Sequence, residues 1–225
     1  MREKKVIRYL LSILLLLALV ILLLLPGYLA YSDSPRPADA VILLVGPEFV
    51  ARRRKACQVA VECRARYLIV PAYMKVFPVT AKQLSDIKGI TDEEIALFYD
   101  RRKRLSYKPY FEDTHVEILA AKRLMDDYGL KSAVFVSSEY HMRRIRLIAQ
   151  RVFGDAKYAI ACIPARVETP DGKLFQVKQR IYWMLSESVK ICWFFAYEIM
   201  AHDKLQFLFG ETGLTRPAAN FSRYA

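Results

Sequence analysis

The sequence has little glycine and no glycine-rich loop. Its 225 residues include eight glycines, and neither a G-x-G-x-x-G nor a Walker pattern occurs. Such loops let the backbone approach the phosphates of a dinucleotide or a nucleoside triphosphate closely. Binding of a nucleotide by the usual loop is therefore not supported. A nucleotide or cofactor binder is the weakest functional hypothesis, and no cofactor is expected.

The cysteines form no recognisable motif either. Cys57, Cys63, Cys162 and Cys192 show no CxxC and no spacing typical of metal ligands. Cys57 and Cys63 are six positions apart in a predicted helix, so they point in different directions and are too far apart for a disulfide. The sequence predicts no metal site, and it favours buried free thiols over a long-range disulfide.

Charge is missing from one long segment near the N-terminus. Residues 9–31 contain no charged side chain, whereas four of the first eight residues are Lys or Arg. An apolar helix of this length can cross a hydrocarbon core of about 30 Å, and basic flanking residues stay in the cytoplasm. The pattern predicts a cytoplasmic basic stub (1–8), a transmembrane anchor (9–31), a linker (32–37) and a main domain outside the cytoplasm.

A cleaved signal peptide is the alternative for this segment. The apolar core of a signal peptide is usually about 7–15 residues long and precedes small residues in an A-x-A-like pattern. The apolar core here is longer, and it leaves through Pro26-Gly27-Tyr28-Leu29-Ala30-Tyr31, with bulky side chains where small ones are needed. An uncleaved anchor is therefore favoured.

Basic residues outnumber acidic ones, with a formal net charge of +12. A basic excess is typical of proteins that bind nucleic acid, anionic lipid or an anionic substrate. Outside the cytoplasm, nucleic acid is the weakest of these partners, so we expect a membrane and an anionic small-molecule or lipid-linked substrate. A generally basic proteome is the simpler alternative. Nothing in the sequence predicts an oligomeric state.

Strand-like and helix-like segments alternate after the linker. Apolar runs typical of buried strands cover residues 39–46, 67–70, 131–137 and 158–163. Helical patterns cover residues 49–63, 114–128, 139–153 and 176–201, with a further helix expected from Thr91 to about Arg104. This alternation predicts one α/β domain over residues 38–201, followed by a tail over 202–225. We expect a doubly wound, mostly parallel sheet of about four to five strands with helices on both faces.

The turn after the third apolar run holds the strongest group of reactive side chains, because ligands of such sheets bind beyond the carboxyl ends of strands. The turn reads SSEYHMRR. Ser137 and Ser138 can donate to a phosphate oxygen, and Arg143 and Arg144 can bind phosphate through two hydrogen bonds. His141 titrates near neutral pH and can act as a general acid or base. A serine cap followed by exposed arginines is the simpler alternative.

Positions near two other strands extend this candidate site. Gly46 follows the first strand, and Arg54 could add charge to an anion held at the next helix N-terminus. Thr114 and Glu117 have the spacing of a capping box, which explains the pair by itself. The functional alternative turns Glu117 into the cleft, where it orients His141 or a water.

The last predicted helix offers a supporting pair and an aromatic band. Glu187 and Lys190 are three positions apart, which favours a surface ion pair. A salt bridge that braces the site from below is the alternative. The band Trp193-Phe194-Phe195 with Tyr197 is expected in the core, with lipid contact as the minority interpretation.

Four pieces of the sequence together resemble the YdcF-like family, the SanA/ElyC/YdcF group of bacterial envelope proteins. The opening run 38–46 resembles A-D-A-I-V-V-L-G-G, and Thr114–Glu117 looks like T-x-E-[NE]. Residues 136–144 are similar to V-T-S-x-Y-H-M-x-R, and Glu187–Lys190 resembles E-x-x-K. The chain departs from the pattern at Pro47, at Pro71-Ala72-Tyr73 and at Val116, where the family has two sets of glycines and an acid.

The resemblance implies a Rossmann-like fold with a polar cleft, in a single-pass protein of the bacterial inner membrane whose main domain is periplasmic. It also implies a role in cell-envelope or peptidoglycan precursor biology. The matched positions are Gly46, Arg54, Thr114, Glu117, Ser137, Ser138, His141, Arg144, Glu187 and Lys190.

Two hypotheses follow from these features. In the first, the domain binds a phosphate-containing precursor, and any enzyme activity is phosphate-ester hydrolysis or transfer. Arg144 and Arg54 would then clamp the anion, His141 would move the proton, and Glu117 would orient it. In the second, the domain is a non-catalytic binding or scaffold protein of the envelope, which the missing glycines and Val116 favour.

Overall fold

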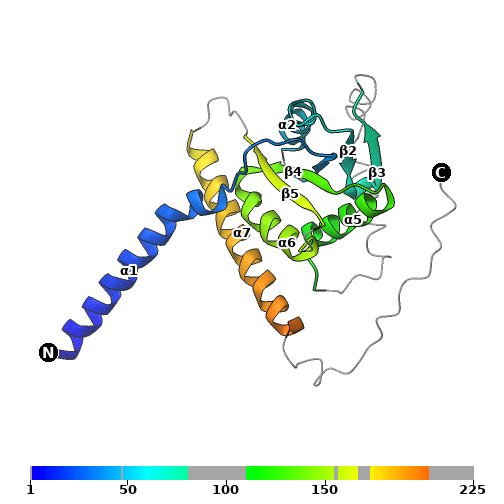
Figure 1. Ribbon diagram of the computed structural model, residues 1–225. Helices are drawn as coiled ribbons and strands as arrows, with labels where there is room; N and C mark the ends of the chain where they lie inside the picture. The colour runs from blue at the N-terminus through cyan, green and yellow to red at the C-terminus, as the bar shows by residue number, and fades with distance from the viewer. Residues whose placement is uncertain (1, 47, 81–109, 155–156, 167–172, 203–225) are drawn as a thin grey trace.

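The computed structural model describes residues 2–46, 48–80, 110–154, 157–166 and 173–202, in which helices and strands alternate (Figure 1). The elements are α1 (Arg2–Leu29), β1 (Ala40–Leu43), α2 (Phe49–Glu62), β2 (Tyr67–Val70), η1 (Pro71–Tyr73), β3 (Lys75–Pro78), α5 (Asp113–Asp127), β4 (Ser132–Ser138), η3 (Glu139–His141), α6 (Met142–Val152), β5 (Ala159–Ala165) and α7 (Lys173–His202). The helix expected from Thr91 to Arg104 lies outside the described residues, as does the tail beyond His202.

The strands form one five-stranded sheet in the order β3-β2-β1-β4-β5. β1 runs parallel to β2 and β4, and β4 runs parallel to β5, which confirms the predicted α/β class and the mostly parallel sheet. β3 pairs antiparallel with β2 at the edge and was not predicted. Its four residues are too few to show a period, and Pro78 is tolerated because an edge strand has a free side.

Helices cover both faces of the sheet (Figure 1). Val41 and Leu43 of β1 pack with α2 on one face, whereas Ile42 packs with α5 and α6 on the other. Successive side chains of a strand point to opposite faces, so a strand covered twice must be apolar at every position. This burial explains the unbroken apolar runs in the sequence.

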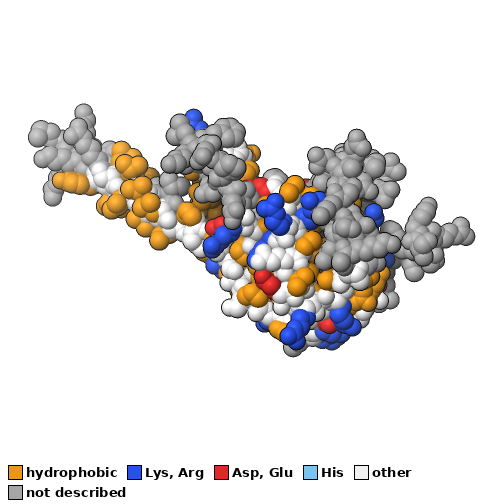
Figure 2. Space-filling model, turned by 90° about the horizontal axis from the view of Figure 1, so that it is seen from above, with side chains coloured by type: hydrophobic (Ala, Val, Ile, Leu, Met, Phe, Trp, Pro, Cys, Tyr) orange, Lys and Arg blue, Asp and Glu red, His pale blue; other side chains and the backbone are white. Residues whose placement is uncertain are grey.

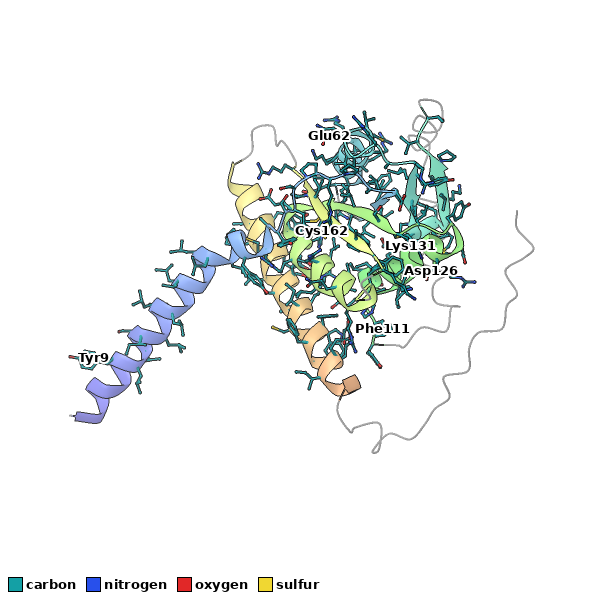
Figure 3. The ribbon with its side chains drawn as sticks, in the orientation of Figure 1. Tyr9, Glu62, Phe111, Asp126, Lys131 and Cys162 are labelled. Carbon is teal, nitrogen blue, oxygen red and sulfur yellow. The ribbon has the colours of Figure 1, made fainter. Side chains whose placement is uncertain are left out.

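α1 projects away from the α/β domain (Figure 1). Its described side chains between Tyr9 and Leu24 are mostly large, apolar and exposed, and they form a hydrophobic surface along the helix (Figure 2). In Figure 3, Tyr9 lies near the outer end of this helix, far from the sheet. Within the part of the chain that the structure describes, no helix is both long enough and apolar enough to cross a membrane. The transmembrane anchor therefore stays a prediction.

The segment predicted as a linker packs along the outer edge of β5. The N–H of Asp33 donates to the carbonyl of Cys162 at 2.8 Å, and the N–H of Cys162 donates to Asp33 Oδ2 at 2.9 Å. Arg36 donates to the carbonyl of Ile160 at 2.6 Å. These bonds satisfy backbone groups that an open sheet edge would expose. The segment therefore ties the domain end of α1 to the sheet.

All four cysteines are free thiols, but the predicted burial holds for only two of them. Cys63 and Cys162 are buried, Cys57 is half-buried and Cys192 is exposed on α7. Figure 3 shows Cys162 on β5. Burial, together with the negative charge of Asp33, raises the pKa of the Cys162 thiol to about 12. This thiol is therefore protonated and unreactive in the folded protein.

Candidate functional site

The carboxyl ends of β1 and β4 lie side by side and define the candidate site. Leu43 pairs with Val136 at these ends. The chain leaves β1 toward β2 on one side, whereas it leaves β4 through α6 toward β5 on the other. This arrangement is the topological switch point where open α/β sheets usually bind ligands. The residues that follow Leu43 and Val136 therefore form the candidate site.

His141 lies at this edge and contacts a carboxylate from α7. Its Nδ1 is 3.0 Å from Oε1 of Glu187. A carboxylate only accepts, so Nδ1 carries the proton and Nε2 is left as the acceptor. The structure gives Nε2 no hydrogen-bond partner among the described residues. Burial lowers the pKa of His141 to about 4, although Glu187 acts in the opposite direction. The imidazole is therefore neutral near pH 7.

Glu187 is buried and is the acceptor for three basic side chains. Arg144 donates to it from Nε at 2.6 Å and from Nη2 at 3.1 Å, and Lys190 donates from Nζ at 3.0 Å. Burial alone would raise the pKa of Glu187, but the hydrogen bonds from His141 and Arg144, together with the charge of Arg144, hold it well below its usual range. The pair of Glu187 and Lys190 is therefore not an ordinary surface pair, because its carboxylate is buried and also contacts His141 and Arg144.

Arg144 is held by two carboxylates. Besides Glu187, it contacts Glu112, whose Oε2 accepts from Nη1 at 2.5 Å. Burial raises the pKa of Glu112, and Arg144 opposes that change. The guanidinium is 3.5 Å from His141 Nδ1, so the predicted neighbours do meet. The charge of Arg144 is nevertheless compensated within the protein, and the predicted clamp on an external anion by Arg144 and Arg54 is not assembled.

The arginine of α2 that enters the cluster is Arg52, which the sequence interpretation missed. Arg52 is buried, and its Nε donates to Ser138 Oγ at 2.9 Å. Its Nη1 donates to the carbonyls of Leu44 at 3.3 Å and Val45 at 2.8 Å. A signal was available, because Arg52 precedes the buried residues Ala56, Val59 and Ala60 at helical spacing. That spacing places it on the face of α2 that covers the sheet.

Arg54, the predicted position, lies elsewhere on α2. Two residues turn an α-helix by about 200°, so Arg52 and Arg54 point in nearly opposite directions. Arg54 is exposed and lines a hollow of about 740 Å³ between the linker, α2 and the end of β5. Lys55, Arg166, Asp33 and Glu48 also line this hollow.

The carboxylates of the hollow already have partners. Asp33 accepts from the hydroxyl of Tyr31 at 2.8 Å and from the N–H of Cys162. Glu48 Oε2 accepts from Ser138 Oγ at 2.5 Å and from the hydroxyl of Tyr140 at 3.1 Å. The hollow therefore offers basic side chains more readily than acidic ones, and Glu48 connects it to the switch-point cluster.

Glu48 also shapes the entrance to α2. It is the N-terminal cap residue and has φ 64° and ψ 28°, a left-handed conformation that costs a non-glycine residue about 1–2 kcal/mol. The bonds from Ser138 and Tyr140 hold it there. Burial raises the pKa of the Tyr140 hydroxyl, and the ring stacks on Trp183 of α7 with centroids 4.8 Å apart. Trp183 thus covers one side of the cluster.

Glu117 is turned toward the end of β1 and does not form the predicted capping box. The cap residue of α5 is Glu112, which makes no side-chain cap bond, and the helix starts at Asp113. Thr114 therefore lies within the first turn, half-buried. Glu117 is buried, and its Oε2 accepts from the N–H of Val45 at 3.3 Å. Glu187 rather than Glu117 contacts His141 and orients it.

Arg143 does not join the cluster. Its Nε donates to the carbonyl of Tyr28 at 2.9 Å, and its guanidinium lies 4.6 Å and 4.7 Å from the ring centres of Tyr28 and Tyr31. Adjacent helical residues point about 100° apart, so Arg143 and Arg144 cannot both face the sheet edge. Arg143 binds the end of α1, which corrects its predicted role in substrate binding.

The remaining predicted residues, Gly46, Ser137 and Ser138, lie at the switch point. Ser137 and Ser138 end β4 and are buried, and Ser138 links Arg52 to Glu48. Gly46 has φ +143° beside the Arg52 guanidinium. Among the described residues, no group of His, Cys, Asp and Glu has the geometry of a metal site.

Comparisons with known proteins add no identification. No family model matches the chain, no curated protein matches it, and no solved structure matches it. The resemblance to the YdcF-like family therefore stays a prediction.

Proposed function

We propose that this chain is a membrane-anchored envelope protein, similar to the YdcF-like group, whose α/β domain binds a phosphate-containing precursor and hydrolyses a phosphate ester. The uncharged segment 9–31 would span the bacterial inner membrane with its basic end in the cytoplasm. The domain would then lie in the periplasm. A peptidoglycan or other lipid-linked precursor is the expected substrate.

The pair of His141 and Glu187 at the switch point carries this proposal. A neutral imidazole whose Nδ1–H is held by a buried carboxylate presents Nε2 in a fixed direction, as a general base requires. In hydrolysis, Nε2 would take a proton from a water whose oxygen attacks phosphorus. The bond from phosphorus to the ester oxygen would break, and that oxygen would then take the proton from the imidazolium.

The charge of a bound substrate would raise the pKa of His141. The pKa of about 4 makes His141 a weak base in the free protein. A phosphate dianion close to Nε2 favours the protonated imidazole and moves the pKa back toward neutrality. The hollow beside Glu48, which Arg54 and Lys55 line, would hold the anion.

The experiment is an assay of the full chain in nanodiscs against a lipid-linked monophosphate and a lipid-linked pyrophosphate. We expect phosphate release that H141A abolishes and that E187Q reduces. R54A should raise KM with little change in kcat. R123A, which removes an exposed arginine from α5, is the matched control and should behave as wild type. Turnover that survives H141A would refute the catalytic assignment.

A non-catalytic binding protein is the second candidate. Its support is that two carboxylates already neutralise Arg144, so this arginine is not set aside for transition-state charge. This candidate predicts binding of the lipid-linked phosphates that R54A weakens, with no phosphate release at any pH. The same assay therefore separates the two functions.

A further inference from the structure

α7 has an outer face that is apolar and exposed. Between Ile181 and Ile199 this face includes Tyr182, Leu185, Val189, Trp193, Phe195 and Ile199, of which Tyr182, Val189 and Ile199 are each more than 60% exposed. At 100° per residue, these positions span an arc of about 160°. We refer to these six residues as the outer face of α7.

The charged residues of the same stretch lie on the opposite side of α7, where Glu187 is buried and Lys190 is 42% exposed. Glu187 contacts His141 and Arg144, Lys190 contacts Glu187, and Glu198 contacts Arg151 at 2.5 Å. A surface helix of a protein surrounded by water has the opposite arrangement, with its apolar stripe on the core and its charges in solvent. An apolar patch of this kind marks a surface that something other than water covers.

The contact between α7 and α1 indicates what covers the outer face of α7. α7 contacts α1, and in Figure 1 it passes the domain end of α1 and then diverges from it. Arg143 fixes that end of α1 to α6 through the backbone and ring of Tyr28. Wherever the proposed anchor leaves the bilayer, the part of α7 that contacts α1 is therefore held beside it.

We propose that the outer face of α7 lies in the membrane interface, with its apolar side chains among the lipids. This inference rests on the membrane anchor of the proposed function. Tyr182 suits such a site, because aromatic side chains with a polar atom concentrate at the boundary between headgroups and acyl chains, whereas Trp193 contributes exposed ring surface and donates its N–H to the carbonyl of Tyr110 at 3.1 Å. The inward charges keep α7 from spanning the bilayer, so it lies along the surface. A second copy of the chain is the rival occupant.

α7 would also connect the bilayer with the candidate site. Trp183, Glu187 and Lys190 come from α7, so the helix that orients His141 would be the one in contact with lipid. The hydrolytic or binding site would therefore face substrates that arrive within the membrane.

Cys192 provides a native probe on this face, since it is exposed and lies between Val189 and Trp193. In the full chain carrying C57S, Cys192 is labelled with an environment-sensitive fluorophore in vesicles of phosphatidylglycerol and phosphatidylethanolamine. We expect blue-shifted emission, quenching by lipids brominated near the headgroup, and protection from iodide. The control carries V61C in a C57S/C192S background, because Val61 on α2 is 67% exposed and should report water.

Three results would overturn the proposal. Iodide quenching of Cys192 in chains that resist carbonate extraction would show an anchored protein with α7 in water. Protection from both quenchers, with energy transfer between labels that grows with protein density, would show a second copy on this face. Extraction of the chain by carbonate would show that residues 9–31 do not anchor the protein in the bilayer. The proposed membrane function would then be wrong as well. As a second readout, Y182S/L185S/V189S should keep the fold and shift the Cys192 emission back toward that of water.

Discussion

A Cβ atom at Gly46 would lie 2.7 Å from Nη1 of Arg52. This nitrogen already donates to the carbonyls of Leu44 and Val45, while Nε of the same guanidinium donates to Ser138. The guanidinium therefore cannot move aside without breaking hydrogen bonds at the ends of both β1 and β4. The glycine after the first strand thus makes room for a side chain of the protein itself.

Substitution of Gly46 tests this relationship. G46A forces alanine to φ +143° and displaces Arg52, so we expect the free energy of unfolding to fall by about 2–4 kcal/mol. G129A is the matched control, because Gly129 has φ +65° and open space around it; it should cost only about 1 kcal/mol. Thermal unfolding followed by circular dichroism measures both. Equal losses of unfolding free energy in G46A and G129A would show that the Arg52 guanidinium can move aside without destabilising the fold.

Removal of Arg144 should be strongly destabilising. R144M leaves the buried Glu187 and the half-buried Glu112 without their main cation, and breaking a buried pair such as that of Arg144 with Glu187 costs about 3–5 kcal/mol. The double variant R144M/E187M should recover part of that loss, since it also removes one of the uncompensated charges. K157A, at an exposed lysine, should stay within about 0.5 kcal/mol of wild type. A loss in the double variant equal to the sum of both single losses would contradict this coupling.

Mild acid should destabilise the folded protein through two histidines. Burial lowers the pKa of both His115 and His141 from 6.5 to about 4. Between these values the unfolded chain binds more protons, so stability is full above pH 6.5 and falls as the pH drops toward 4. At 1.36 kcal/mol per pKa unit, each histidine contributes on the order of 3 kcal/mol. Below pH 4.5 the unfolded chain also binds a proton at Glu187, whose pKa is lowered in the folded protein, so stability falls further.

Denaturation at a series of pH values measures this dependence. H141Q keeps a hydrogen-bonding side chain that does not titrate, so its stability should vary less between pH 6.5 and 4 than that of wild type. Glu112 changes stability in the opposite direction. Its pKa is raised in the folded protein, so the folded state loses stability as the pH rises above 4.5. An unchanged slope in H141Q would place His141 in water rather than against Glu187.

Arg143 should control the orientation of α1 without affecting the switch point. R143A removes the bond to Tyr28 and the stacking between Tyr28 and Tyr31. Spin labels at L24C and V61C, in a background without other cysteines, should then give a broader distance distribution. R143K should behave nearly as R143A, because lysine lacks the planar guanidinium that stacks on both rings. R166A, an exposed arginine elsewhere, should leave the distribution narrow.

The strands and most helices were predictable, because their signals come from neighbouring residues. The predicted strand 67–70 matches β2 as observed, and the predicted helix 49–63 matches α2 to within one residue. The exception is β3, whose four residues become a strand only through pairing with β2. Its existence depends on a partner strand rather than on its own pattern.

The candidate site was predictable in position but only partly in membership. The sequence located the reactive group after the strand that became β4, and His141, Arg144, Glu187 and Lys190 do meet there. It did not identify Arg52 as the buried arginine of α2, and it assigned Glu117 the orienting role that Glu187 holds. Glu187 is 43 positions from Arg144, and no spacing rule reaches that far.

Local chemistry along the chain determined the alternating α/β order, the doubly covered apolar strands and the uncharged stretch at residues 9–31. These properties depend on side-chain periods and composition, which neighbouring residues set without any distant contact. Only the tertiary structure decided that Arg144 is neutralised by Glu112 and Glu187, that Arg143 binds α1, and that α7 turns its charges inward. Each of these outcomes depends on which elements pack together and on the direction a side chain takes from its helix. Burial then makes pairing obligatory, because a charge removed from water must find its partner within the fold.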